Sequence, residues 1–314
     1  MDLYSIGEMV IDFVPGSEPA SYIRKAGGAP ANVAIAVSKN GLGAAMACKV
    51  GDDDFGRFLM DTLAEYNVKA ACPELCGEAI TTMAFVTLAE DGERRFTFAR
   101  KPGADMLLKE EEVLESDIDD AVIIHAGSCS LSAQPEAAAT VRAMRLGHEK
   151  GKLVSFDVNY RNLMWNDDVD ACAAAVKDIL QYVDLLKISE EEVDMMGGEA
   201  AIPELMKAHG IALVVQTLGA NGVRAYFGGD YFDVAGRKVR AVDATGAGDA
   251  FWGAFLAKLR ICGVEKASDL TPAIIREALE YGNVSGSICV QTKGAIASIP
   301  TRMQIEAVIR EGKA

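Results

Sequence analysis

The chain has 314 residues, half of them apolar, and its 46 acidic and 31 basic side chains give a formal charge of −15. Binding along a nucleic acid or on an anionic membrane surface needs a basic face, so this charge argues against both kinds of partner. We also expect neither a signal peptide nor a membrane span, because the opening residues lack a basic segment and no apolar run approaches roughly 18 residues.

Short apolar runs that suit buried strands alternate with amphipathic helical segments, a pattern typical of an α/β fold with a mostly parallel sheet between layers of helices. The expected strands are Leu3–Ile6, Ala45–Val50, Ala121–His125, Leu153–Phe156, Leu185–Ile188 and Ala212–Gln216. The helices expected between them are Ala31–Asn40, Phe55–Tyr66, Pro135–Lys150, Asp170–Gln181 and Pro203–His209. The last third is predicted to be rich in helix, over Ala247–Arg260, Pro272–Cys289 and Arg302–Glu311.

Two stretches interrupt this alternation. Residues 10–25 form two extended pieces around Pro15 and Gly16, and residues 81–100 alternate polar and apolar side chains around a turn at 90–93, as a β-hairpin does. We expect these stretches to form a small sheet that acts as a lid, from about 10–26 and 79–104. Because no Pro- or Ser-rich linker or internal repeat is present, we expect a single domain over 1–314 with this lid inserted in it.

The cysteines indicate the compartment. Their number is seven, which is odd, and a chain of this length can bury its own core without a disulfide framework. Three scattered histidines, at 125, 148 and 209, show no metal-ligand spacing. We therefore expect free thiols and a cytoplasmic protein.

The strongest signal for chemistry is the segment Val-Asp-Ala-Thr-Gly-Ala-Gly-Asp-Ala-Phe at 242–251. A helix that begins inside this glycine cluster leaves N–H groups without intrahelical partners, and these groups and the helix dipole together attract an anion. If the anion is a transferring phosphoryl group, Asp249 can take the proton from the attacking hydroxyl. The alternative is that Asp243 or Thr245 caps the helix and the glycines only make a turn.

A second signal is Ala-Gly-Gly-Ala-Pro-Ala-Asn at 26–32. Pro30 suits the first turn of a helix, the glycines allow close approach of backbone to a ligand, and Asn32 carries an amide that suits a polyhydroxylated substrate. Asp12 lies at the carboxyl end of the first strand, where open α/β sheets bind ligands, and its carboxylate can accept hydrogen bonds from two hydroxyls. The alternatives are an ordinary glycine-rich loop and a turn aspartate.

Other nucleotide motifs are missing. The chain has no Walker A loop, and Gly41-Leu42-Gly43 lacks the third glycine of a dinucleotide fingerprint because Met46 stands there. We therefore interpret this segment as the end of a helix before a strand, which argues against a nicotinamide-dependent oxidoreductase. A second competing class is a sugar- or nucleotide-binding regulator without catalysis.

In this order and at these separations, the three segments resemble the signatures of the ribokinase-like (PfkB) carbohydrate kinases. The first signature runs from Gly27 to Gly56 and the second ends at Asp249, and the similarity covers essentially the whole chain. Residues 27–32, Arg100–Leu108 and Asn159-Tyr160-Arg161 followed by Trp165 are most similar to the fructokinases. Neighbouring branches, such as 2-keto-3-deoxygluconate kinases, share much of this pattern.

The resemblance implies a ribokinase-like three-layer fold and ATP-dependent phosphorylation of a primary hydroxyl of a small sugar, most similar to fructose phosphorylation. The implied general base is Asp249, and the implied anion hole is Gly246, Ala247 and Gly248. The implied sugar contacts are Asp12, Gly28, Asn32, Ser128 and Arg161. The implied ATP contacts are Thr217, Gly219, Gly222 and Asn283. The positions where the family often binds a monovalent cation such as K⁺ are Asp243, Thr245 and Ser298.

One family element departs from its pattern. The Asn-x-x-Glu motif that is linked to Mg²⁺ appears here as Ser189-Glu190-Glu191-Glu192, so Glu192 keeps the acid while Ser189 replaces the amide. With a charge of −15, we expect ATP to be attracted by backbone N–H groups, a helix end and bound cations. The exposed edge of the lid could pair with a second copy in a homodimer.

Overall fold

The computed structural model describes residues 1–18, 20–88 and 94–312, and the larger sheet in this part of the chain has nine strands, in the order β13-β12-β11-β10-β9-β8-β1-β4-β5. These strands are β1 (Leu3–Ile6), β4 (Ala44–Ala47), β5 (Val68–Ala70), β8 (Ile123–Gly127), β9 (Leu153–Asp157), β10 (Leu185–Ser189), β11 (Leu213–Thr217), β12 (Gly222–Phe227) and β13 (Asp230–Ala235). Neighbours from β5 to β11 pair in parallel, so their carboxyl ends lie at one edge of the sheet.

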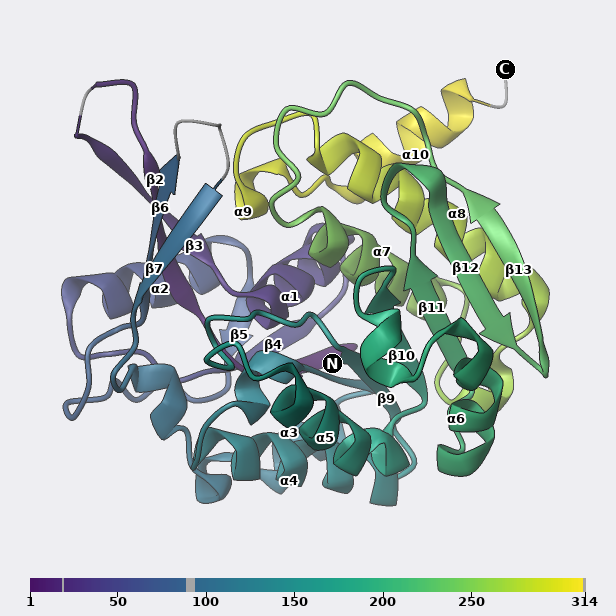
Figure 1. The fold of residues 1–314 in the computed structure, drawn as a ribbon, viewed down its shortest axis with the longest axis horizontal. Coiled ribbons are helices and arrows are strands. Elements are labelled where there is room, and N and C mark those ends of the chain that lie inside the picture. Colours follow the sequence, from purple (N-terminus) through teal and green to yellow (C-terminus); the bar gives the residue numbers. More distant parts are fainter. Residues whose placement is uncertain (19, 89–93, 313–314) are drawn as a thin grey trace.

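Helices cover both faces of this sheet (Figure 1). One face carries α1 (Ala29–Lys39), α2 (Asp54–Glu65), α7 (Ala247–Ile261), α8 (Pro272–Cys289) and the short α9 (Ala295–Ser298). The opposite face carries α3 (Glu115–Asp120), α4 (Glu136–Glu149), α5 (Val169–Ile179) and α6 (Ile202–His209). The last helix, α10 (Arg302–Glu311), packs on α7 and α8 through Ile305.

The core follows from the alternation of side chains along the central strands. Leu185 and Leu213 point to the layer of α1 and α7, whereas their neighbours Leu186 and Val214 point to the layer of α4 and α5. All four side chains are fully buried. A parallel strand covered on both faces needs such a continuous apolar run, which is why these strands could be recognised in the sequence.

The second sheet, which we call the small sheet, stands off the main one and has the order β3-β2-β6-β7 (Figure 1). Its strands are β2 (Val10–Pro15), β3 (Tyr22–Gly27), β6 (Met83–Leu88) and β7 (Arg94–Ala99). Segments far apart in the sequence meet here, since β2 pairs with β6 in parallel. The predicted fold class is confirmed, while the predicted turn at 90–93 lies outside the described residues.

Some elements differ from the sequence prediction. The chain continues past β11 into an antiparallel hairpin of β12 and β13, which was not predicted. Its turn is Gly228-Gly229, and both residues have positive φ, at 64° and 86°, as a two-residue hairpin turn requires. Helix α1 starts at Ala29, two residues before the predicted start, because Pro30 lies inside the first turn.

Two expectations about the surroundings of the protein can be compared with the structure. Within the described residues, no helix is both long and apolar enough to cross a bilayer. The seven cysteines carry free thiols; Cys262 is half-buried and the others are buried. The Gly41 segment ends α1 and leads into β4, as predicted, with Gly41 at φ 81°.

Candidate active site

A cavity of about 650 Å³ opens between the small sheet, the carboxyl ends of the central strands and the first turns of α1 and α7. It brings together eight residues that the sequence singled out at widely separated positions, namely Asp12, Gly28, Asn32, Arg161, Thr245, Gly246, Gly248 and Asp249. Arg161 lines this cavity and is solvent-exposed. The cavity therefore joins the predicted sugar contacts to the predicted general base.

The start of α7 forms one wall. Gly246 precedes the helix with φ 76°, and a Cβ on it would lie 2.7 Å from the Cβ of Ala295, so glycine is required there. No side chain caps α7; instead, an oxygen of Asp243 accepts hydrogen bonds from the backbone N–H and the hydroxyl of Thr245. The capping alternative is therefore wrong. The N–H of Ala247 donates to the carbonyl oxygen of Ala244, while the N–H groups of Gly248 and Asp249 have no acceptor within the helix.

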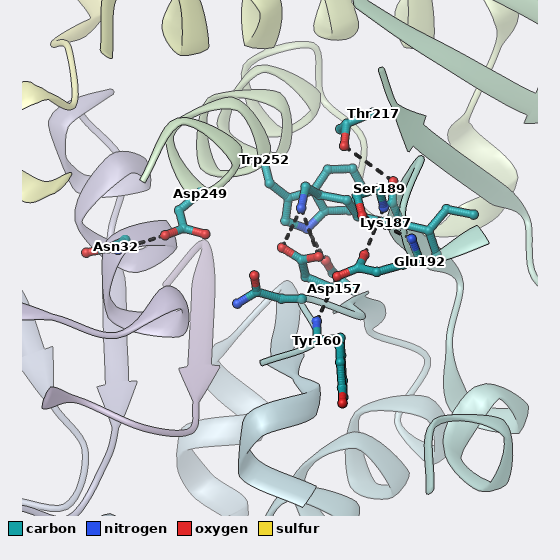
Figure 2. Close-up of polar contacts among 12 residues, drawn as sticks. Asn32, Asp157, Tyr160, Lys187, Ser189, Glu192, Thr217, Asp249 and Trp252 are labelled. Carbon is teal, nitrogen blue, oxygen red and sulfur yellow. Dashed lines mark hydrogen bonds and ion pairs between the residues drawn. The ribbon is translucent and has the colours of Figure 1, made fainter. Parts of the chain in front are cut away.

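Asp249 lies in the first turn of α7 and is 7% exposed. Its Oδ2 accepts a hydrogen bond of 2.7 Å from Nδ2 of Asn32, so the first turns of α1 and α7 meet through these two side chains (Figure 2). The other amide atom of Asn32, Oδ1, is buried and has no hydrogen-bond partner among the described residues. A carboxylate held at a helix N-terminus inside a cavity is well placed to accept a proton.

Asp12 and Gly28 form the side of the cavity next to the small sheet. Burial raises the pKa of Asp12 to about 6; the positive charge of Arg161 opposes this rise, and the negative charge of Asp249 adds to it. Gly28 has φ 113°, and a Cβ there would lie 2.5 Å from the carbonyl oxygen of Glu8. The glycine is therefore required for close backbone approach, as the sequence indicated.

Sequence reasoning missed a buried ion pair beside the α7 wall. Nζ of Lys187 on β10 donates to both carboxylate oxygens of Asp157 on β9, at 2.9 and 2.7 Å (Figure 2). The two residues are register partners on adjacent parallel strands. Nζ also lies 3.6 Å from the position that a Cβ on Gly248 would take, so an ammonium group stands beside the start of α7. Despite burial, the neighbouring carboxylates raise the pKa of Lys187.

The Ser189-x-x-Glu192 segment forms a reciprocal pair at the end of β10. The backbone N–H of Glu192 donates to Oγ of Ser189, while Oε2 of Glu192 accepts from the backbone N–H of Ser189 at 2.8 Å. Oε1 of Glu192 accepts from the backbone N–H of Tyr160 at 2.7 Å. The departure from Asn thus preserves a local turn of the capping-box type, and Glu192 connects it to the loop after β9.

Strand β9 also holds α7 in place. Oγ of Ser155 accepts a hydrogen bond of 2.9 Å from Nε1 of Trp252, which is fully buried one turn after the start of α7. The same hydroxyl lies 3.0 Å from Nδ1 of His125. Burial and the charge of Lys187 lower the pKa of His125 to about 3, so this histidine is a neutral core residue.

Nine predicted site residues lie outside the cavity lining: Ser128, Glu192, Thr217, Gly219, Gly222, Asp243, Ala247, Asn283 and Ser298. Ser128 is fully buried in a 3₁₀ turn after β8 and does not line this cavity, whereas its neighbour Cys129 does. Asn283 on α8 donates to the carbonyls of Val234 and Ala235 at the end of β13.

The residues predicted around a monovalent cation meet at one loop. Oδ2 of Asp243 accepts from the backbone N–H of Gly294 at 3.0 Å, and Oγ of Ser298 donates to the carbonyl oxygens of Gly294 and Ala295. Thr245 is tied to Asp243 as described above. In the described part of the chain, no group of three or more His, Cys, Asp or Glu side chains could hold a metal ion.

Comparison with known proteins agrees with this geometry. The family model "pfkB family carbohydrate kinase" matches residues 2–302. "Fructokinase-1" of Oryza sativa subsp. japonica is 39% identical over 312 residues, which cover 96% of this chain and 95% of that protein. The crystal structure of a fructokinase with bound ATP from Xylella fastidiosa has a TM-score of 0.94 at 31% identity, covering 100% of this chain and 99% of that one.

A second solved structure is the fructokinase from Vibrio cholerae O395 in its fructose-, ADP- and calcium-bound form. It has a TM-score of 0.87 at 31% identity and covers 98% of each chain. These findings confirm the resemblance drawn from the two signatures and argue against the oxidoreductase alternative. The chain belongs to the pfkB family of carbohydrate kinases.

Proposed function

We propose that this sugar kinase transfers the γ-phosphoryl group of ATP to a primary hydroxyl of fructose. The observation that carries the proposal is the cavity in which Asp249, at the N-terminus of α7, lies with Asp12 and Asn32. The fructokinase relatives, one solved with ATP and one with fructose and ADP, support this choice of donor and acceptor.

In the proposed reaction, the sugar lies between the small sheet and the starts of α1 and α7. Asp12, Gly28, Asn32 and Arg161 line the cavity there, and carboxylate, amide and guanidinium groups suit the hydroxyls of a sugar. Asp249 accepts the proton of the attacking hydroxyl as that oxygen bonds to the γ-phosphorus of ATP. The hydrogen bond from Asn32 fixes the direction of the Asp249 carboxylate during this step.

The transferring phosphoryl group needs positive charge as it moves. We infer that the N–H groups of Gly246 and Gly248 and the ammonium of Lys187 provide it on the protein side, since the N–H of Ala247 already donates to Ala244. The proposed role of Lys187 adds a charged side chain to the backbone groups and bound ions expected from the sequence. Mg²⁺, when bound with ATP, neutralises phosphate oxygens. Both carboxylate oxygens of Glu192 already accept backbone N–H groups, so we expect Glu192 to act on this ion only through water.

We also propose where the nucleotide and a monovalent cation bind. Thr217, Gly219 and Gly222 end β11 and begin β12, beside the edge of the sheet on which β10 ends, and we propose that ATP lies along this edge. For Asp243, Thr245 and Ser298, we propose that K⁺ binds beside the Gly294 loop. Replacing K⁺ by Li⁺ in the assay is then expected to lower kcat.

The small sheet is proposed to exclude water from the site and to join two copies of the chain. Strand β3 is an edge strand of that sheet, and Tyr22 and Ile23 on it are 46% and 51% exposed. Exposed edges of this kind pair readily with another chain. Light scattering of the purified protein tests whether it is a dimer, and Ile23→Lys is expected to give a monomer if β3 is the contact.

A kinase assay tests the proposed function. Purified protein with ATP and Mg²⁺ is offered fructose, ribose, 2-keto-3-deoxygluconate and nucleosides, and ADP release is measured. We expect kcat/KM for fructose to exceed that for the others by at least about tenfold. A higher value for another sugar would replace fructose as the substrate. Sugar binding without any turnover would instead support the regulator alternative.

A further inference from the structure

One buried carboxyl group of the cavity has no role in the mechanism above. Glu8 comes two residues after the end of β1, is 4% exposed and contributes to the lining of the cavity. A glutamate is rarely this buried unless it is paired with a cation or serves a site. Its position beside Gly28 and Asn32 places it next to the proposed sugar contacts.

Among the described residues, no cation forms an ion pair with Glu8 alone. The guanidinium of Arg100 approaches it but binds Asp105 at 2.7 Å and Glu136 at 3.1 Å, and both of these carboxylates are buried. Burial, assisted by the charge of Asp105, therefore raises the pKa of Glu8 to about 7. Ion pairing cannot explain why a carboxyl group is kept at this position.

The partner of Glu8 is instead the start of α1. Oε1 accepts a hydrogen bond of 3.2 Å from the backbone N–H of Ala29, the first residue of that helix. Oε2 is buried and has no hydrogen-bond partner in the described part of the chain. One oxygen of the carboxyl group thus holds an N–H group that no residue within α1 can satisfy.

Gly28 explains why a residue outside α1 accepts the hydrogen bond from the N–H of Ala29. The residue before a helix normally caps it with its own side chain, but here that residue is Gly28, which has none. No larger residue fits, because a Cβ would lie 2.5 Å from the carbonyl oxygen of Glu8. The backbone of Glu8 excludes a capping side chain at 28, and the side chain of Glu8 replaces it.

We propose that Glu8 is a positioning residue for the sugar site, which holds the first turn of α1 so that Asn32 meets both Asp249 and the sugar. Asn32 lies one turn after Ala29 on the same helix, and Oδ1 of its amide is the unpartnered atom described above. The inference rests on the proposed function, since it assigns Glu8 to the sugar side of the same cavity. Glu8 itself takes no part in the proton transfer.

Two substitutions test the proposal in the full-length protein with fructose and ATP. Glu8→Gln keeps an oxygen that can accept from the Ala29 N–H, so we expect the KM for fructose to stay within about threefold of wild type. Glu8→Ala removes the acceptor, and we expect the KM for fructose to rise about tenfold or more while the KM for ATP stays within about twofold. The matched control is Glu136→Gln, which alters a buried carboxylate outside the cavity and should leave the KM for fructose unchanged.

A double mutant separates positioning from general damage. Because Glu8 acts through Asn32, Glu8→Ala combined with Asn32→Ala should have a KM for fructose no higher than that of Asn32→Ala alone. Additive effects, or equal loss in Glu8→Gln and Glu8→Ala, would overturn the inference. If Glu8→Ala does not fold, the KM for fructose of Glu8→Gln decides the question. If the wild type phosphorylates no sugar, the proposed function fails; if it does and Glu8→Ala is unaffected, only this inference fails.

Discussion

The two walls around the proposed phosphoryl site are built in different ways. The start of α7 is a local structure, in which consecutive residues from Gly246 to Asp249 supply backbone N–H groups and a carboxylate. The opposite wall joins Asp157 and Lys187, which are thirty positions apart in the sequence and meet only because β9 and β10 pair in parallel register. The residues of the first wall lie in one sequence motif, whereas the residues of the second come together only when the sheet has formed.

This difference explains what each wall can contribute. Backbone N–H groups at a helix end hold an anion with partial charges that do not depend on pH. An ammonium group provides a full charge but needs a counter-ion when it is buried, and Asp157 is that counter-ion. We expect substitution of the Asp249 carboxylate to act on the chemical step alone, and substitutions of the Asp157–Lys187 pair to affect stability as well.

The largest expected effect is at the proposed base. Asp249→Asn removes the proton acceptor but can keep the hydrogen bond to Asn32, so we expect kcat to fall about 10³-fold with little change in melting temperature. Steady-state kinetics and a thermal melt of the same preparation measure both. A variant that turns over within a few-fold of wild type would remove Asp249 from the mechanism.

The opposite wall is tested with Lys187→Met. We expect kcat to fall about 10²-fold, and the loss of the ammonium leaves Asp157 buried without a counter-ion, at a cost of about 3–5 kcal/mol in the free energy of unfolding. Adding Asp157→Leu should recover much of the stability in urea denaturation but none of the rate. Recovery of kcat in the double variant would show that Lys187 is only structural.

Substitutions of two glycines in the α7 wall are expected to affect stability and catalysis to different extents. In Gly248→Ala, the new Cβ lies 3.6 Å from Nζ of Lys187, an ordinary contact, so the fold should tolerate the methyl group while kcat falls about tenfold. In Gly246→Ala, the positive φ and the 2.7 Å approach to Ala295 should lower the free energy of unfolding by about 1–3 kcal/mol. Equal melting temperatures for the two variants would contradict this reading of the turn.

Glu8 is a buried carboxyl group, as Asp157 is, but no lysine forms an ion pair with it in the described part of the chain. Its pKa rises from 4.5 to about 7 on folding, so the folded protein binds the proton more tightly and loses stability as the pH rises from about 4.5 to about 7. The loss is about 3 kcal/mol, and Asp12 should add a smaller one in the same direction. Urea denaturation at pH 5 and pH 8 should show a smaller decrease for Glu8→Gln than for wild type.

The smallest effect is expected at Ser189, at the end of β10. Ser189→Ala removes the hydroxyl that accepts from the N–H of Glu192 but leaves both bonds of the Glu192 carboxylate. We expect the free energy of unfolding to fall by about 1 kcal/mol, with kcat unchanged. A large loss of Mg²⁺-dependent activity in this variant would instead give Ser189 a direct role beside the ion.

The sequence predicts the features that depend on local motifs better than those that depend on strand pairing. The central parallel strands, the longer helices and the start of α7 each leave a local pattern, so they were recognised at or near their observed positions, whereas the short β5, α3 and α9 were not predicted. The hairpin β12–β13 also has a local sign, the Gly228-Gly229 pair between two β-rich runs, which was overlooked. Lys187 and Glu8 leave no such sign, because burial and strand register give each of them its partners.

Ser128 is the opposite case, since a loose match in the sequence placed it in the pocket. Residues 128–131 form a tight turn in which adjacent side chains point in different directions, and it is Cys129 that reaches the cavity. A difference of one residue in such a turn cannot be resolved by pattern alone. The proposed ATP contacts after β11 depend in the same way on loop geometry.

Strand β9 carries a consequence for how the site tolerates movement. Two residues apart on it, Ser155 holds α7 through Trp252 and Asp157 holds Lys187. A displacement of β9 therefore carries the base and the ammonium together, and the spacing between them is kept. The proposed closure of the small sheet over the sugar would therefore leave this spacing unchanged in each catalytic cycle.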